Sequence, residues 1–554
     1  MAYEVEVTNS KDKVKSDYVK RRYDELLSDR QPWHQVWQEV TDYIYPKTTD
    51  FLRSEGVPGK KRNTRIYDST ALVAHQAFSS GIQSFVTSPT DMWFELEPGF
   101  KFALQDRKIK EYLEFATEIL YKVFRTPSFK FYARAHELYQ EAGALGTGVF
   151  LTEDTTTTIK FSTIDLAKCF LAENSEGRID FVIRREPYTG RQLLEEFPNI
   201  DTELKEKIEK KMKGEGNAAN WNVLHCVMPR TERNVESKMA TNLPYASLYV
   251  LEEECYLLKE GGYHEFPYQF LRLDSHAEEV YGRSPAMTAL PDVRTLNELR
   301  KLNINAVQKA VAPPLMVPMD TFPKGINTAP NALNYYRQGY AKQELIRPIE
   351  MGNNVQLGFA TEAELKASIK EAFHVDMFLD TKSERMSATE SLQREESRMR
   401  LMAPQMGRMH SDFIQPLIMR VFNICVRMGI IPAVPDELKQ VGFQPQYVSP
   451  LARSQKQLQA AGLGKAIQDL IGYASVDPSV LDYINGDGVA KTILAAHAAP
   501  STAFRSDEEV AKIRQGRQQQ QQQMQGVESA NTSADTIKKL ADAMKSGQGQ
   551  GFIA

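Results

Sequence analysis

Residues 291–314, PDVRTLNELRKLNINAVQKAVAPP, are the stretch from which the fold can be worked out. Apolar residues recur in it every three or four positions, as on one face of an amphipathic helix. We expect the helix to begin at Pro291, whose missing N–H is tolerated in a first turn, and to end at Pro313 and Pro314. Roughly 20 residues would span about 30 Å. The apolar face is Leu296, Leu299, Leu302, Ala306 and Ala310, and the opposite face is Arg294, Glu298, Lys301, Asn305 and Lys309. An ordinary helix packed in a core has the same pattern.

The segment that follows, up to about Gly352, is rich in proline, which excludes a long helix. Residues 315–317 and 344–346 are candidate short strands. Three tyrosines lie between them and are packed either locally or against another protein: Tyr335, Tyr336 and Tyr340.

A second helix is predicted to return along the first. Thr361 and Glu364 have the spacing of a capping box, which indicates a helix start. Its apolar row is Leu365, Ile369, Phe373 and Met377. Two helices joined by a proline-rich tip predict a stalk that leaves the body of the protein and comes back.

A polar loop at 379–386 follows, and Ser387 with Glu390 indicates the start of a long third helix. The apolar stripe of this helix continues to Leu417. Pro404 and Pro416 lie inside it and predict kinks rather than an end.

Composition sets limits on function. The chain has 554 residues, of which 42% are apolar and 25% charged, so several folded modules are expected. The formal net charge is −4, whereas a protein that binds nucleic acid tightly is usually basic, so any DNA contact must be local or weak.

The four cysteines form no CxxC pair, which argues against a zinc site or a disulfide framework and fits a reducing compartment. The sequence contains neither a signal-like apolar region in its first 30 residues nor an apolar run of 18, so no membrane partner is expected.

The rest of the chain predicts an α+β protein that is predominantly helical. Helices are expected at 12–45, 67–88, 107–145, 453–472 and 478–497, with a further helix starting at the pair Ser506 and Glu509 and running into a Gln tract. Strands are expected at 149–152, 158–163, 169–172, 178–185, 221–228 and 247–258, with a turn at 174–177.

Catalytic motifs are missing. Gly143, Gly146 and Gly148 are followed by a strand rather than a helix, so they do not form a phosphate loop, and Gly464-Lys465 is followed by Ala466 where a P-loop needs Ser or Thr. There is no HExxH or GxSxG motif, the nine histidines lie singly, and no carboxylate pair stands out as an acid–base couple. The sequence therefore predicts no enzyme, metal or cofactor, with an active site of dispersed residues as the alternative.

Short motifs then suggest a family. They are RRY at 21–23, WHQVW at 33–37, YP at 45–46, YDSTA at 67–71, WFEL at 93–96, GTG at 146–148, YGRSP at 281–285 and ATE at 388–390. Each motif is weak alone, but in this order and spacing, over most of residues 15–430, the chain resembles the portal (head-to-tail connector) proteins of podovirus-type bacteriophages.

This resemblance implies the phage portal fold and its parts. They would be a wing at 1–285, an outgoing stem helix at 286–313, a clip at 314–352, a returning stem helix at 353–378, a tunnel loop at 379–387, a long kinked wing helix at 388–428, a crown at 429–500, and a C-terminal helical barrel or flexible Gln-rich tail at 501–554.

The resemblance also implies a function. Such a protein forms a dodecameric ring at one capsid vertex of the virion, assembled in the host bacterial cytoplasm. It passes double-stranded DNA during packaging and ejection, binds the terminase large subunit and then tail or adaptor proteins, and contacts major capsid and scaffolding proteins. It is not an enzyme, because the packaging motor is the separate terminase.

Candidate site residues follow from these expectations. Lys382 and Arg385 on the tunnel loop and Lys301 and Lys309 on the stem are candidates for the DNA channel, although solvated surface positions fit them equally. The candidates for partner binding on the clip are Tyr335, Tyr336, Arg337 and Tyr340. The rival interpretations are another ring-forming phage channel or tail-tube component, and a large α+β enzyme.

Overall fold

The computed structural model divides the chain into two compact units. The first unit comprises Met1–Leu96, Ala116–Val434 and Gln444–Ala452, and the second comprises Glu97–Phe115, Pro435–Phe443 and Arg453–Ala554. The residues that the structure describes are 13–46, 51, 66–99, 107–155, 158–215, 220–234, 237, 239–276, 278–311, 315–316, 347–348, 355–378, 403–448, 450–474, 479, 482, 484–496, 509–520 and 537–538.

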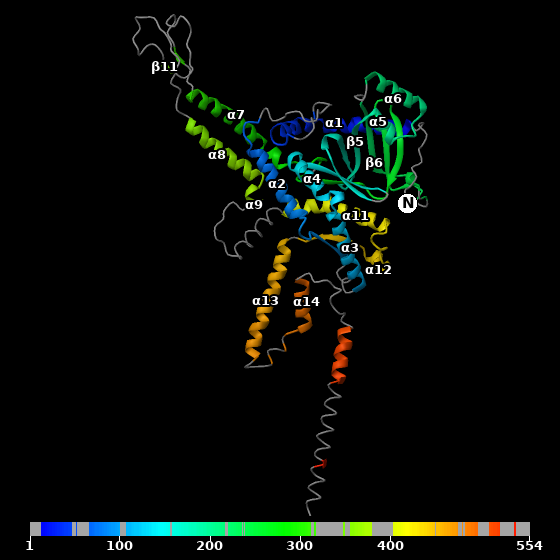
Figure 1. Ribbon diagram of the computed structural model, residues 1–554, viewed down its shortest axis with the longest axis vertical. Coiled ribbons are helices and arrows are strands. Elements are labelled where there is room, and N and C mark those ends of the chain that lie inside the picture. The colour runs from blue at the N-terminus through cyan, green and yellow to red at the C-terminus, as the bar shows by residue number, and fades with distance from the viewer. Residues whose placement is uncertain are drawn as a thin grey trace, which may run out of the picture. The chain divides into compact units, whose positions relative to one another are not determined.

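The first unit is built around a five-stranded antiparallel sheet (Figure 1). Its strands follow one another as a meander in the order β4 (Cys169–Glu173), β5 (Ile179–Thr189), β6 (Asn220–Pro229), β7 (Tyr245–Leu251) and β8 (Tyr256–Tyr263). The predicted turn at 174–177 is confirmed, since Gly177 has a φ of 74° and the N–H of Asn174 donates to Arg178 O. The segment predicted as one strand at 247–258 is two strands, because Cys255, with a φ of 45°, lies in a turn between β7 and β8.

Helices cover both faces of this sheet because successive side chains of a strand point to opposite faces. On one face, Val19, Tyr23 and Leu26 of α1 (Lys13–Tyr43) pack against Leu224 and Cys226 of β6. On the other face, α5 (Gly190–Glu196) and α6 (Thr202–Glu215) pack against Trp221 and Val223 of the same strand. The sequence did not predict α5 and α6.

A second, three-stranded sheet has the order β3 (Ile159–Ile164), β2 (Thr147–Asp154) and β9 (Tyr268–Arg272). The strand β9 was not predicted. Helices α2 (Thr70–Val86) and α4 (Phe131–Leu145) pack against each other in the same unit. The elements β1 (Phe94–Pro98), α3 (Arg107–Arg125) and β12 (Phe443–Tyr447) are each divided between the two units, and short η turns occur at Pro127–Phe129, Leu166–Lys168 and Ala240–Asn242.

The glycines of the GTG and YGRSP motifs form a close packing contact. Gly146 ends α4 with a φ of 82°, and a Cβ atom there would collide with the carbonyl oxygen of Gly282. The ring of Tyr281 lies 5.1 Å from that of Trp37, and the N–H of Gly282 donates to Thr147 Oγ1 at 2.7 Å. These motifs therefore serve packing, because only glycine allows the two backbones to approach so closely.

Helices α7 (Pro285–Val311) and α8 (Val355–Ala372) lie side by side, as predicted for an outgoing and a returning helix (Figure 1). Three boundaries were wrong. The helix α7 starts at Pro285, so Pro291 lies inside it, and α8 includes Thr361, which is therefore not a cap. The returning helix also does not run unbroken to 378: His374 has a φ of 52°, and a separate short helix follows, α9 (Val375–Phe378).

Two residues near the start of the proline-rich segment pair with two near its end, as expected of short strands. Strand β10 (Leu315–Met316) is antiparallel to β11 (Arg347–Pro348), with Leu315 opposite Pro348. The first strand falls inside the predicted 315–317, but its partner follows the predicted 344–346 instead of coinciding with it.

The long helix after the predicted loop is described from residue 403. Residues 403–408 are helical, a wide π-helical turn η7 (Met409–Ile414) follows, and α11 (Gln415–Arg427) completes it. The interruption predicted around Pro416 is thus confirmed as a widening of the helix just before that proline.

The second unit contains α12 (Asp436–Val441), most of α13 (Pro450–Ala474), α14 (Gly486–Ala496) and a helix at 509–520. The predicted helix at 453–472 is confirmed, and the one predicted at 478–497 is shorter. Arg514 on the last helix forms an ion pair with Asp487 on α14. Among the described residues, no helix combines the length and apolar character needed to cross a bilayer.

Candidate functional site

The contact between α7 and α8 is polar at its centre. Glu362 of α8, only 3% exposed, accepts hydrogen bonds from Asn303 Nδ2 at 2.6 Å and from Arg300 Nη1 at 3.0 Å. Lys366, one turn further along α8, lies 3.8 Å from the same carboxylate. A buried carboxylate needs such partners to offset its lost hydration. We call these residues the interhelix lock.

A glycine allows the two helices to come this close. A Cβ atom on Gly358 of α8 would overlap Oδ1 of Asn303. Any larger residue at position 358 would force the side chain of Asn303 to move and would disturb its hydrogen bond to Glu362. The lock and the glycine together fix where along their lengths the helices meet.

Hydrogen bonds join the base of the helix pair to the start of α2. The buried side chain of Asn297 on α7 accepts the N–H groups of Tyr67 and Asp68 through Oδ1, at 2.7 and 3.3 Å. Asp68 accepts the N–H of Thr70 in the first turn of α2 and pairs with Lys366 of α8 at 3.0 Å. The YDSTA motif therefore connects both helices of the pair to the body.

Aromatic packing completes the attachment. Phe373 at the end of α8 is fully buried, and its ring lies 6.2 Å from that of Phe78 on α2. Phe378 of α9 lies 5.9 Å from the same ring and covers Gly81, where a Cβ atom would collide with it. The base of the pair is thus held rigidly on α2.

At the lock and beyond it, α7 leaves apolar side chains exposed on two sides. Leu302 is 61% exposed and Val311 is 81% exposed. Ile304, Val307 and Val311 continue the three- and four-residue steps of Arg300 and Asn303, so they lie toward the side of α7 that contacts α8, whereas Leu302 points to the opposite side. The predicted apolar face was therefore wrong at Leu302, because α8 is contacted through Arg300 and Asn303 instead. A helix that is apolar on two sides is normally buried on both.

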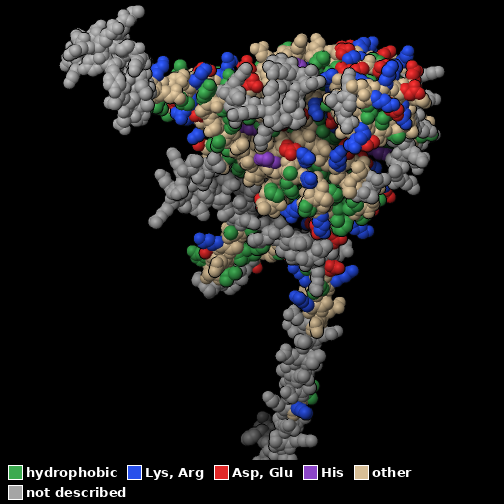
Figure 2. Space-filling model, turned by 45° about the horizontal axis from the view of Figure 1, so that its top comes forward, with side chains coloured by type: hydrophobic (Ala, Val, Ile, Leu, Met, Phe, Trp, Pro, Cys, Tyr) green, Lys and Arg blue, Asp and Glu red, His purple; other side chains and the backbone are tan. Residues whose placement is uncertain are grey.

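The predicted stem cations lie on the described helix α7. Lys301 is 45% exposed, with its ammonium 3.9 Å from Glu298 and 5.8 Å from the ring centre of Tyr67. Lys309 is exposed two turns further out. In Figure 2, hydrophobic, basic and acidic side chains are interspersed on this helix pair, and no single sign of charge dominates the face that is drawn. The predicted residues Lys382, Arg385, Tyr335, Tyr336, Arg337 and Tyr340 lie outside the described residues.

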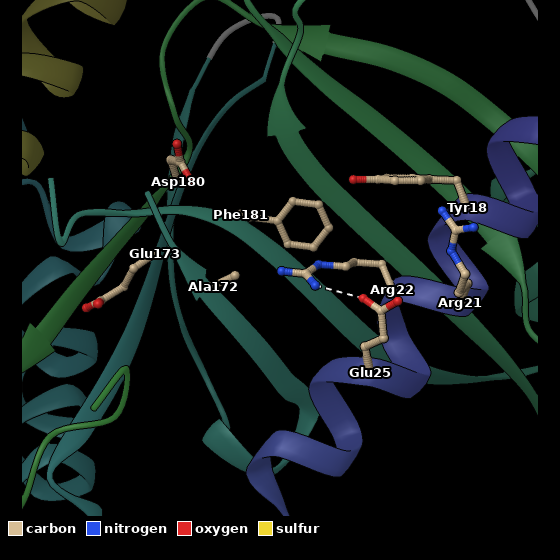
Figure 3. A pocket seen from close by; sticks show the side chains of 8 residues that line it. All are labelled: Tyr18, Arg21, Arg22, Glu25, Ala172, Glu173, Asp180 and Phe181. Atoms are coloured by element: carbon tan, nitrogen blue, oxygen red, sulfur yellow. Dashed lines mark hydrogen bonds and ion pairs between the residues drawn. The ribbon is translucent and has the colours of Figure 1, made fainter. Parts of the chain in front are cut away.

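A pocket of about 330 Å³ lies elsewhere in the first unit, between α1 and the β4–β5 hairpin (Figure 3). Arg22 pairs with Glu25 at 2.7 Å and lies 5.7 Å from the ring centre of Phe181, while Glu173 is paired with Arg272. The lining residues are Tyr18, Arg21, Arg22, Glu25, Ala172, Glu173, Asp180 and Phe181. They offer ion pairing and two aromatic rings but no nucleophile with a neighbouring base.

Comparison with known proteins decides the family. The family model for the bacteriophage head to tail connecting protein matches residues 16–504. The chain belongs to this family. It is 27% identical over 536 residues to the probable portal protein of Bordetella phage BPP-1, with 95% of each chain covered. It is 26% identical over 537 residues to the portal protein of Salmonella phage epsilon15, with 94% of each chain covered.

The portal resemblance inferred from the short motifs is thereby confirmed, and with it a predominantly helical α+β fold. The match includes the whole of α7 and α8 and therefore the interhelix lock. Sequence reasoning had missed the lock, although Glu362 falls at helical spacing from Leu365 and Ile369 and so was bound to lie on the same face.

Proposed function

We propose that this chain is a portal protein that assembles as a dodecameric ring at one vertex of a phage capsid. In this ring the paired helices α7 and α8 are the stem that surrounds a channel for double-stranded DNA. The observation that carries the proposal, beside the family, is that α7 is apolar on two sides at the lock and beyond it. A ring of identical copies covers both sides, because each stem then lies between two neighbours.

The ring contact is of the heterologous kind, in which one surface meets a different surface of the next copy. Leu302, on the side of α7 away from α8, would face one neighbour, and the surface of Ile304, Val307 and Val311 that α8 leaves exposed would face the other. Burying their exposed area would stabilise the assembly by on the order of 4 kcal/mol per copy. The polar lock does not compete for this contact, because its members are already satisfied within one chain.

The DNA-facing surface is assigned to the charged side of the stem. A duplex presents one phosphate charge per about 1.7 Å, so a uniformly basic wall would hold it tightly and oppose sliding. On α7, Lys301 is partly neutralised by Glu298, which fits a weak contact of about 0–1 kcal/mol. We assign Lys301 and Lys309 on the stem, together with Lys382 and Arg385 on the tunnel loop, to the channel wall.

The remaining parts are assigned in the same scheme. The wing would be 1–285 with the long helix 388–428, the stem 286–313 and 353–378, the clip 314–352, the tunnel loop 379–387, the crown 429–500, and the barrel or tail 501–554. The clip would bind the terminase large subunit during packaging and tail or adaptor proteins afterwards, through Tyr335, Tyr336, Arg337 and Tyr340. The wing would meet major capsid and scaffolding proteins in the virion.

Electron microscopy of the purified full chain tests the assembly. We expect rings of twelve copies with an opening wide enough for a duplex. Leu302→Glu should shift the protein to monomers, whereas Gln308→Glu, at an exposed polar position of the same helix, should leave the rings intact. Monomers of the wild-type chain would contradict the proposal and favour the enzyme alternative.

A deletion tests the DNA channel. Removing 379–387 should leave rings intact and reduce packaged DNA per particle. Rings that package normally without the loop would overturn its assignment, and rings that support no packaging even in the wild type would favour a tail-tube component.

A further inference from the structure

The π-helical turn η7 has a property that the proposed function leaves unused. In this six-residue turn the N–H of Gln415 donates to His410 O, five residues back instead of the usual four. The next residue, Pro416, has no N–H with which to restore the α-helical pattern. The turn therefore contains one residue more than a regular helix of the same length.

The side of the helix that follows the turn is firmly fixed. Leu417, Ile418 and Val421 of α11 are fully buried. Arg420, 2% exposed, donates to the carbonyl oxygens of Thr152 at 2.8 Å and Glu265 at 2.9 Å. The residues that precede the turn are held less: Ala403, Pro404 and Gly407 are exposed.

Two ion pairs clamp the turn to the end of β9. Asp412, inside the turn, accepts hydrogen bonds from Arg272 at 3.3 Å, and Arg408, just before it, donates to Asp274 at 2.6 Å. Arg272 also donates to Gly177 O at 3.2 Å, so it is fixed independently of the turn. The positions of Asp412 and Arg408 depend on the register of the helix, whereas their partners Arg272 and Asp274 stay in place.

Two side chains at the turn carry buried polar atoms that are unsatisfied. Within the described part of the chain, Gln405 Oε1, just before the turn, and His410 Nδ1, inside it, have no hydrogen-bond partner. Such atoms raise the free energy of the state that contains them. These two side chains therefore offset part of the stabilisation that the clamps give to the observed turn.

We propose that η7 is a register switch in this helix. Conversion of the wide turn to α-helix releases its extra residue toward residues 403–408 and moves them relative to α11 by about 1.5 Å and about 100°. Met409 then occupies the place of Arg408, and both clamps break together. This device regulates how the long wing helix meets the channel, a statement that rests on the proposed portal function.

Two variants of the full chain act on the switch in different ways, one by abolishing the change of register and one by making it easier. The first variant combines deletion of Ser411, which removes the extra residue, with Pro416→Ala, which restores the missing N–H. It should be locked as a regular helix, with residues 403–408 and α11 in their present places. Asp412→Asn weakens one clamp and should favour conversion. The control is Ser411→Ala, which keeps the residue count; among the described residues, the Ser411 hydroxyl donates to Arg408 O and to Asp412 Oδ1.

Hydrogen exchange of the amides of residues 409–415 is the first measurement. Exchange should be about tenfold faster in Asp412→Asn than in the control, because the turn opens each time the helix changes register, and about tenfold slower in the deletion variant, which cannot change register. Equal exchange in all variants would overturn the switch whether or not the chain is a portal. If the deletion variant does not fold, the comparison of Asp412→Asn with Ser411→Ala decides.

Packaged DNA per particle is the second measurement, and it addresses the regulatory role. The deletion variant should form rings yet package at least about tenfold less DNA than the control, because a locked helix cannot change register. Normal packaging by the locked variant would overturn the regulatory role. If the wild type forms rings that package nothing, the portal function fails, and the exchange experiment alone then decides on the switch.

Discussion

Replacing Glu362 by alanine removes the centre of the interhelix lock. Asn303, which is buried, loses the acceptor at 2.6 Å and has no access to water in exchange. An unsatisfied buried donor costs about 1–3 kcal/mol, and the lost charge-assisted bond from Arg300 adds about 1 kcal/mol because that side chain can reach water. We therefore expect Glu362→Ala to weaken the α7–α8 contact by about 2–4 kcal/mol. Glu362→Gln keeps an acceptor for Asn303 and should cost only about 1 kcal/mol.

Hydrogen exchange of the amides of α7 and α8 measures this contact locally, without requiring the whole chain to unfold in one step. Every 1.4 kcal/mol is about a factor of ten, so Glu362→Ala should speed exchange of the outer amides about 30- to 700-fold. Glu364→Ala, at an exposed position of the same helix, is the matched control and should change exchange little. The reasoning is refuted if alanine at 362 behaves like alanine at 364, or if glutamine at 362 is as damaging as alanine.

Three further outcomes are expected. Gly358→Ala should weaken the α7–α8 contact by about 1–3 kcal/mol in the same exchange assay, because its Cβ meets Asn303. Gly462→Ala, at a helical position with open space around it, should not destabilise its helix. Equal effects of the two substitutions would contradict the close-contact argument. Gly146→Ala should abolish soluble folded protein, because the new Cβ would collide with Gly282 and position 146 has a left-handed φ. A normal yield and melting temperature would show that the backbones at Gly146 and Gly282 can separate. Burial raises the pKa of Glu141 well above its ordinary value, so ionisation of this side chain favours the unfolded state as pH rises above about 4.5. Glu141→Gln should therefore raise the urea concentration at the unfolding midpoint at pH 7 but not at pH 4. An equal change at both pH values would contradict this argument.

The element pattern of this chain was largely predictable because most helices and strands bury one clear face. The periodic apolar residues of α1, α7 and α13 indicated helices, and the change to a period of two after Gly148 indicated strands. The errors occurred where local signals competed. Pro291 and the pair Thr361–Glu364 fit helix starts locally, but α7 already packs on the body before Pro291, and α8 already packs on α7 at Gly358, so each helix starts earlier.

The lock was missed for a related reason. Sequence patterns assign polar residues to the solvent, yet Asn303 and Glu362 occupy the positions that face the partner helix. Nothing local distinguishes such a buried pair from two surface residues, because the information lies in the other helix, more than fifty positions away in the chain. A polar residue at helical spacing within an otherwise apolar row, as Glu362 is, would have been the available signal.

The distribution of polar and apolar groups on the helix pair separates two requirements of a ring-shaped channel. A contact made only of apolar side chains tolerates sliding by a turn, whereas a buried hydrogen-bonded carboxylate is satisfied in one register only. Placing Glu362, Asn303 and Arg300 inside each pair fixes the geometry of every subunit before assembly. In the ring that we propose, the apolar residues are left for contacts between copies, where many small contacts would allow the stems to adjust against one another. A substitution in the lock should accordingly alter the subunit and leave the preference for a ring, whereas Leu302→Glu should do the reverse.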